Sequence, residues 1–282
     1  DDVATYQHPR WWLERLRRRW PQQWMAIVAA DNAPPPMSLR VNARQGSVAA
    51  YLDRLASSGV SGRALGELGI LLERAVAVDV LPGFFDGSVS VQDVGAQRAA
   101  ELLAPSDGMR VLDACAAPGG KTAHLLERAD LDLLALDADA GRARRIEENL
   151  QRLRLVATVC VGDASQPAGW WDGRLFDAIL ADVPCSASGV VRRHPDIKSL
   201  RRESDVRKFA QTQVAILDAL WSVLKPGGRL LYATCSVFVE ENQGQIDAFL
   251  VRRPDARRVS EEQWLPCGES DGFYYALLEK AH

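Results

Sequence analysis

Two cysteines, each following a short apolar run, constrain this chain more than any other feature. Cys185 comes shortly after residues 178–181, and Cys235 comes shortly after residues 230–233. Both runs are predicted to be buried strands, because each is short, apolar and followed by polar residues. Parallel strands of one sheet present their carboxyl ends at a common edge, where ligands bind in open α/β sheets. The sequence therefore predicts two thiols at one edge of one sheet, an arrangement that suits covalent catalysis.

A glycine-containing loop follows another predicted strand, residues 111–114, and opens a helix. The loop consists of Cys115, Ala116, Ala117, Pro118, Gly119, Gly120, Lys121 and Thr122. Doubly wound folds hold nucleotide-like cofactors on such loops. Its end also resembles a nucleoside-triphosphate P-loop, but Cys115 stands where that pattern needs its first glycine, and Pro118 interrupts it. We therefore predict a cofactor loop that does not cradle a triphosphate.

Three aspartates end the next predicted strands: Asp137, Asp163 and Asp182. A single aspartate at such a place is more often a helix cap, but a set of them at successive strand ends indicates a binding crevice. Asp137 occupies the position where an acidic residue accepts hydrogen bonds from ribose hydroxyls. Carboxylates would repel a pyrophosphate and attract a cationic sulfonium. The predicted cofactor is therefore S-adenosylmethionine.

The patterns predict two domains, residues 1–88 and residues 89–282. The first contains a helix near the N-terminus, strands over 37–42 and 71–80 and a helix over 48–55, which make a small α+β unit. In the second, strands are predicted near 110–114, 132–136, 156–161, 176–181 and 229–234. Helices are predicted near 119–128, 140–152, 205–224 and 240–252. This alternation predicts an α/β fold with a mostly parallel sheet, closed at one edge by an antiparallel strand over 273–278.

Composition excludes several classes of protein. The 282 residues are 47% apolar and 25% charged, as in an ordinary globular chain. No apolar run reaches about 18 residues and the start lacks an export signal, so we expect a cytoplasmic protein without membrane spans. The five cysteines show no Cys-x-x-Cys spacing, which argues against a zinc site or a disulfide framework, and we expect no metal. Cys115 and Cys160 are interpreted as buried apolar residues, and Cys267 as a loop residue.

The net charge of −3 does not by itself indicate a nucleic-acid partner. Basic residues nevertheless gather at 10–20 and 192–208. Each of these islands either binds phosphates or forms a solvated face, and the sequence alone leaves both interpretations open.

Longer motifs resemble those of the bacterial RNA cytosine-5 methyltransferases, Sun-type enzymes above all. They are the loop at 116–122, the segments 182–186 and 189–198, the segment 232–236, and the flanking His8-Pro9 and Asp271-Gly272-Phe273-Tyr274. The resemblance implies a Rossmann-like methyltransferase domain after a small domain similar to an RNA-recognition fold. It also implies an N-terminal helical domain in the full-length protein, and the start without Met fits a fragment that lacks it.

The resemblance further implies that the chain methylates carbon 5 of a cytosine in small-subunit (16S) ribosomal RNA. Cys235 is then the attacking nucleophile, Cys185 assists breakdown of the covalent adduct, and Asp182 faces the amino edge of the cytosine near the cofactor. Lys121 orients the base, lowers a thiol pKa, or caps the loop by bonding carbonyls.

The target cytosine must leave its stack, so we expect RNA that is single-stranded or loosely paired there. The RNA-contacting residues are expected to be Arg192, Arg193, His194 and Lys198, and the protein is expected to be a monomer. Two other functions stay open: a ribosome-assembly factor that binds RNA without catalysis, and a methyltransferase acting on protein or a small molecule.

Overall fold

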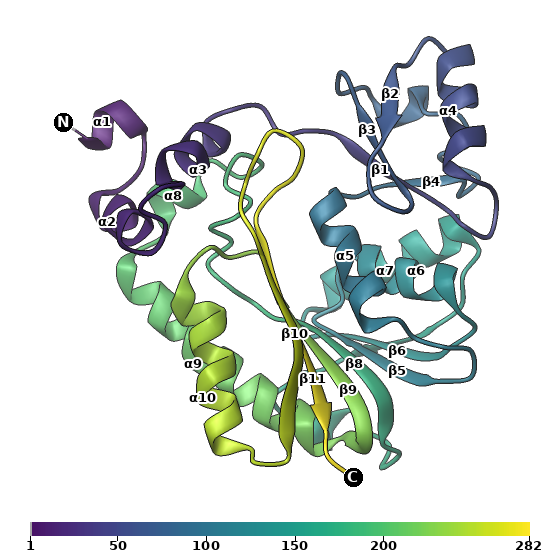
Figure 1. The fold of residues 1–282 in the computed structure, drawn as a ribbon. Helices are drawn as coiled ribbons and strands as arrows, with labels where there is room; N and C mark the ends of the chain where they lie inside the picture. The colour runs from purple at the N-terminus through teal and green to yellow at the C-terminus, as the bar shows by residue number, and fades with distance from the viewer. Residues whose placement is uncertain (1) are drawn as a thin grey trace.

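Two β-sheets organise the chain in the computed structural model, which describes residues 2–282 (Figure 1). The larger sheet has the strand order β10-β11-β9-β8-β5-β6-β7. Its strands are β5 (Arg110–Ala114), β6 (Asp132–Asp137), β7 (Thr158–Val161), β8 (Phe176–Asp182), β9 (Leu224–Thr234), β10 (Ala256–Trp264) and β11 (Phe273–Lys280). Strands β5 to β9 pair in parallel, so their carboxyl ends share one edge. The predicted Rossmann-like α/β sheet is confirmed.

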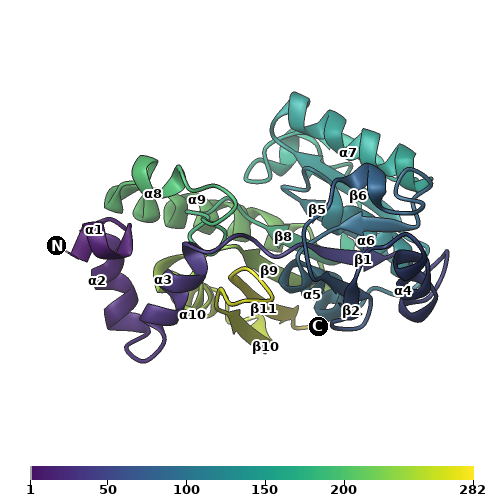
Figure 2. The ribbon, with the colours of Figure 1, turned by 90° about the horizontal axis from the view of Figure 1, so that it is seen from above.

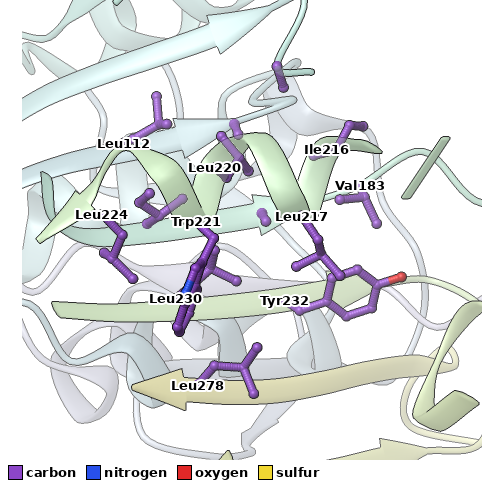
Figure 3. Close-up of a cluster of buried hydrophobic side chains, with 14 of the residues drawn as sticks. Leu112, Val183, Ile216, Leu217, Leu220, Trp221, Leu224, Leu230, Tyr232 and Leu278 are labelled. Carbon is purple, nitrogen blue, oxygen red and sulfur yellow. The ribbon is translucent and has the colours of Figure 1, made fainter. Parts of the chain in front are cut away.

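Helices cover both faces of this sheet because its central strands are apolar on both sides. One face packs against α5 (Val94–Leu103), α6 (Gly120–Arg128) and α7 (Ala140–Leu153). The other packs against α9 (Glu203–Ser222) and α10 (Gln243–Arg252). Figure 3 shows α9 placing Leu217, Leu220 and Trp221 over Leu230 of β9 and Leu278 of β11. This buried layer holds the ends of β8 and β9 in fixed register.

The predicted strand at 273–278 is present as β11, but it does not close the sheet. It lies between β9 and β10, antiparallel to both. The edge strand is β10, which the sequence analysis did not predict. Partly buried and exposed residues alternate along most of β10, and five of its nine residues are charged or amides, so it lacks the apolar run that marks an inner strand.

The smaller sheet is antiparallel and has the order β2-β3-β1-β4. Its strands are β1 (Ser38–Val41), β2 (Gly62–Ala64), β3 (Gly69–Leu72) and β4 (Val89–Val91), and α4 (Val48–Ser57) packs on it. The predicted strand over 71–80 is wrong beyond Leu72, because the chain leaves the sheet there and makes the 3-10 turn η1 (Val78–Val80). Since β4 pairs with β1, the small sheet extends past residue 88. The division 1–88 and 89–282 stays a prediction.

Three short helices begin the described chain: α1 (Asp2–Tyr6), α2 (Arg10–Arg19) and α3 (Trp24–Asp31). They lie beside α8 (Ile197–Leu200) and α9, away from the small sheet (Figure 2). Trp12 and its neighbours on α2 pack against Val191, Val237 and Phe238. These three residues follow the two predicted cysteines in the chain, so the N-terminal helices support the loops that carry the thiols.

Candidate active site

The two predicted cysteines meet at the carboxyl ends of neighbouring strands. Cys185 follows β8 and Cys235 follows β9, and these strands pair in parallel as far as Asp182 opposite Ala233. The two Sγ atoms are 3.4 Å apart. Cys185 is buried, with 8% of its surface exposed, whereas Cys235 is only partly buried. The site therefore contains one enclosed thiol in contact with one more accessible thiol.

The environments of the thiols differ in charge as well as in exposure. The hydrogen bond with Cys235, together with burial, raises the pKa of the Cys185 thiol well above its usual range. Cys185 is therefore protonated at neutral pH. Cys235 lies close enough to the Lys121 ammonium for the two groups to interact electrostatically. Cys235 is therefore the sulfur that is both more accessible and next to a cation.

Lys121 belongs to the cofactor loop, and its side chain reaches the end of β8. Its Nζ donates a hydrogen bond to Asp182 Oδ2 at 2.7 Å. Burial opposes the charge of Lys121, but the Asp182 carboxylate outweighs burial and raises the lysine pKa. Within residues 2–282, Lys121 donates to no backbone carbonyl, so the interpretation as a cap of loop carbonyls is wrong. The ammonium instead orients the Asp182 carboxylate beside Cys235.

The cofactor loop turns sharply from β5 into α6. Gly119 has φ of 95°, and a Cβ there would lie 3.1 Å from the backbone of Ile146. Glycine is therefore required at this point by both conformation and space. The turn leaves the first backbone N–H groups of α6 at the crevice edge, where helix N-termini commonly face ligands.

The predicted aspartates lie at this edge in different surroundings. Asp137 is buried, and its carboxylate accepts hydrogen bonds from the N–H groups of Ala117 and Asp139 at 3.1 Å each. It also pairs with Arg142. Asp163 is exposed, and hydrogen bonds from Ser165 lower its pKa. Asp137 thus shapes the loop directly, and the cofactor-binding roles of Asp137 and Asp163 stay predictions.

Asp113, on β5, is a site residue that the sequence analysis missed. It is fully buried, and its Oδ2 accepts a hydrogen bond from Thr122 at 2.6 Å while its Oδ1 has no partner within the described chain. Burial, which Thr122 only partly offsets, raises its pKa to about 7. A charged residue inside an otherwise apolar strand was the available signal. Asp113 interacts electrostatically with Asp137 and Asp182, so the three carboxyl groups form an acidic cluster at the carboxyl ends of β5, β6 and β8.

Glu241 was missed as well. It lies in the 3-10 turn η3 (Val239–Glu241), is fully buried, and accepts hydrogen bonds from the residues that follow the two cysteines, Ser186 and Ser236. No local sequence signal marks it, because Ser186, which makes two of these hydrogen bonds, lies 55 residues away in the chain.

Two of the predicted RNA-contacting residues, Arg192 and Arg193, pair with carboxylates in this structure, and their contact with RNA stays a prediction. The Arg192 side chain is 1% exposed and forms an ion pair with the equally buried Asp271 at 2.5 Å. Arg193 pairs with Asp271 and Asp93. The pairing arises because Gly189 and Gly272 are joined by a 2.8 Å backbone hydrogen bond, which brings Asp271 under both arginines. Sequence patterns showed the positive charges but not the carboxylates beneath them.

The other predicted RNA-contacting residues lie nearer the surface. His194 is exposed, and Lys198 donates a hydrogen bond to Asn32 at 2.6 Å. Their contact with RNA stays a prediction.

Of the remaining cysteines, Cys267 lies in a loop as expected, whereas Cys115 and Cys160 are only partly buried. Cys115 and Cys160 pack against the apolar core, and burial raises the pKa of Cys115 to about 12. Cys267 is exposed between β10 and β11. Across residues 2–282, no three His, Cys, Asp or Glu side chains gather as a metal site would require. In the same range, no helix is long and apolar enough to span a membrane.

Comparison with known proteins gives concordant matches. The 16S rRNA methyltransferase RsmB/F family matches residues 100–279, and the Methyltr_RsmF/B-like ferredoxin-like domain matches residues 8–79. Ribosomal RNA small subunit methyltransferase B of Vibrio cholerae is 50% identical, with 100% of this chain and 67% of that protein covered. The Erwinia tasmaniensis protein of the same name is 52% identical, with 99% and 68% covered.

A solved structure agrees with these sequence matches. The crystal structure of a methyltransferase homolog protein from Pyrococcus horikoshii has a TM-score of 0.87 at 27% identity, covering 99% of this chain and 98% of that one. The present chain spans about two thirds of the length of the two bacterial relatives.

Proposed function

The chain belongs to the 16S rRNA methyltransferase RsmB/F family, and from that premise we propose that it methylates carbon 5 of a cytosine in small-subunit ribosomal RNA through a covalent cysteine adduct. The observation that carries the proposal is the 3.4 Å contact between Cys185 and Cys235 beside the pair of Lys121 and Asp182. A methyltransferase that attacked a nitrogen or oxygen directly would need neither thiol, because those atoms are already nucleophilic.

Carbon 5 of cytosine is a poor nucleophile, so a thiolate must first add to carbon 6. Cys235 takes this role because it is the more accessible sulfur and lies near the Lys121 ammonium. Asp182, held by Lys121, faces the amino edge of the base and stabilises the ring as the thiolate adds. S-adenosylmethionine supplies the electrophilic methyl group, and the loop at 115–121 with Asp113, Asp137 and Asp163 would hold it.

Release of the product requires removal of the carbon-5 proton and cleavage of the bond between carbon 6 and sulfur. Cys185 holds its proton next to the Cys235 sulfur. Cys185 can donate that proton to the Cys235 sulfur as its bond to carbon 6 breaks, and it can accept the proton from carbon 5. The two cysteines together therefore gain one proton. The raised pKa of Cys185 suits this exchange, because an acid of low pKa would not recapture a proton.

The target base must leave its stack to reach a partly buried sulfur. The proposed substrate is therefore ribosomal RNA whose target cytosine is single-stranded or loosely paired. An assembly factor without catalysis would not need two thiols in contact. The similarity to ribosomal RNA methyltransferases favours RNA over a protein or small-molecule substrate.

The test uses labelled ribosomal RNA, S-adenosylmethionine and denaturing gel electrophoresis. Cys235→Ala should give neither a slow-migrating protein–RNA band nor methylated product. Cys185→Ala should give a persistent band, because breakdown of the adduct is impaired. Cys160→Ala, a cysteine on β7, serves as the matched control and should resemble the wild type. Bisulfite sequencing of the product then shows whether the methyl group is on carbon 5.

The reverse pattern would exchange the roles of the two cysteines. Absence of an adduct in every variant would refute the covalent mechanism, and methyl transfer to protein in place of RNA would refute the proposed substrate.

A further inference from the structure

One buried carboxylate joins the two loops that carry the thiols. Glu241 accepts hydrogen bonds from the Ser186 backbone N–H at 2.6 Å and from the Ser186 hydroxyl at 2.5 Å. It also accepts one from the Ser236 hydroxyl at 2.5 Å. Ser186 directly follows Cys185, and Ser236 directly follows Cys235. The same side chain therefore binds both loops one residue beyond each sulfur.

Further hydrogen bonds fix this arrangement. Ser188 and Ser236 place their hydroxyls 3.0 Å apart, and the Val237 N–H donates to Ser188 Oγ at 2.9 Å. Asn242 Nδ2 donates to the Ser236 carbonyl at 2.8 Å. The Tyr232 hydroxyl donates to the Glu241 carbonyl at 2.6 Å, which ties η3 back to β9. A fully connected buried network of this kind is rigid, because any shift leaves polar groups unpaired.

Stability alone is a poor explanation for this carboxylate. Burial raises the pKa of Glu241, while the hydrogen bonds from Ser186 and Ser236 oppose that shift. Replacing buried charged groups with apolar ones is often neutral or stabilising. Both loops, by contrast, need an acceptor that can hold several donors at once, and a carboxylate does so with short, strong hydrogen bonds.

We propose that Glu241 is a positioning residue that holds Cys185 and Cys235 in contact, and that Ser186 and Ser236 transmit its effect. The effect of Glu241 on methylation rests on the proposed function, whereas the effect of Glu241 on the distance between the two thiols does not. The two claims can therefore be tested separately.

The first experiment measures thiol proximity without RNA. Diamide takes one hydrogen from each of two thiols, becomes the hydrazine and leaves a disulfide, which peptide mapping assigns to Cys185 and Cys235. Glu241→Ala should slow formation of this disulfide at least about tenfold, since small displacements of reacting groups have large effects on rate. Glu241→Gln keeps the shape and an acceptor for the Ser186 N–H, so it should stay within about threefold of the wild type.

Glu240→Gln is the matched control. Glu240 is the preceding residue, but it faces Arg15 and not the serines, so its loss should leave the rate unchanged. Calorimetric affinity for S-adenosylmethionine, whose crevice does not include Glu241, reports whether each variant is folded. If Glu241→Ala does not fold, Ser236→Ala removes a single hydroxyl and should still slow disulfide formation about threefold or more.

The second experiment measures methyl transfer to ribosomal RNA. Glu241→Ala should lower kcat at least about tenfold with KM little changed, and Glu241→Gln should restore most of it. An unchanged disulfide rate in folded Glu241→Ala and Ser236→Ala would overturn the positioning role. A slowed disulfide rate in a protein that methylates no RNA in any form would support the positioning role and refute the proposed function.

Discussion

The carboxyl ends of β5 and β6 are built from residues close in sequence, whereas those of β8 and β9 depend on distant ones. In the first region, called here the cofactor half, Asp113 bonds Thr122 nine residues away and Asp137 bonds Ala117 twenty residues away. In the second, the thiol half, Ser186 bonds Glu241 across 55 residues and Arg192 bonds Asp271 across 79.

This difference separates two ways of making a site. The cofactor half is a loop whose own backbone and nearby side chains give it its shape. The thiol half brings together loops that have no local reason to adopt their positions. We therefore expect remote substitutions to damage the thiol half and local ones to damage the cofactor half.

The largest expected effect breaks a remote support of the thiol half. Arg192→Met leaves the buried Asp271 carboxylate paired with Arg193 but without Arg192. Removal of one member of a buried ion pair costs about 3–5 kcal/mol of unfolding free energy. Denaturant unfolding measures the loss. Arg207→Met, an exposed position on α9, should change stability by less than about 0.5 kcal/mol. Equal losses of unfolding free energy in the two variants would contradict the expected importance of remote contacts for the thiol half.

The next effect belongs to the cofactor half and depends on pH. Asp113 has a pKa of about 7 when folded and about 3.9 when unfolded. Between these values the folded chain retains a proton that the unfolded chain has released, so rising pH removes up to about 4 kcal/mol of stability, and the loss persists above pH 7. Asp113→Asn replaces the carboxyl group with an amide, which does not titrate between pH 4 and pH 8. The unfolding free energy of the wild type relative to this variant should therefore fall from pH 4 to pH 8, and a constant difference would contradict the assignment.

A smaller effect concerns the cofactor itself. Asp137→Ala should weaken binding of S-adenosylmethionine by at least about tenfold, because a hydrogen bond to a charged acceptor contributes roughly 1.5–3 kcal/mol. Isothermal titration calorimetry measures the affinity. Asp132→Ala, at the other end of the same strand, is the control and should bind normally. Unchanged affinity for Asp137→Ala would place the ribose site elsewhere.

The smallest effect is expected where the sequence suggested a larger one. Arg193 already pairs with Asp271 and Asp93, so Arg193→Gln should change the salt dependence of RNA affinity by less than about one unit of logarithmic slope. Filter binding over a range of salt concentrations measures this slope. A loss of one full unit or more would show that Arg193 exchanges its carboxylates for phosphate when RNA binds.

The sequence predicted the central strands, the loop between β5 and α6 and the placement of both thiols at one edge of the sheet, because apolar runs and strand ends are local patterns. It did not predict β10, whose polar residues resemble those of a surface loop. Nor could it predict the partners of Glu241 and Arg192, since a buried charge is recognised only when its counterpart is known. The ion pairs of Arg192 and Arg193 could not be predicted for this reason: charge is visible in a sequence, but burial and pairing are properties of the fold.

The place of β11 has a consequence for synthesis of the protein. A ribosome completes β5 to β9 before it reaches Asp271 and Gly272, which hold the segment after Cys185. Strand β11, which must lie between β9 and β10, emerges later still. The cofactor half can therefore fold on the nascent chain, whereas the thiol half is completed only after β11 has emerged. The pair of thiols thus reaches its final geometry later than the cofactor half, and a nascent chain that ends before Asp271 lacks the contacts that complete it.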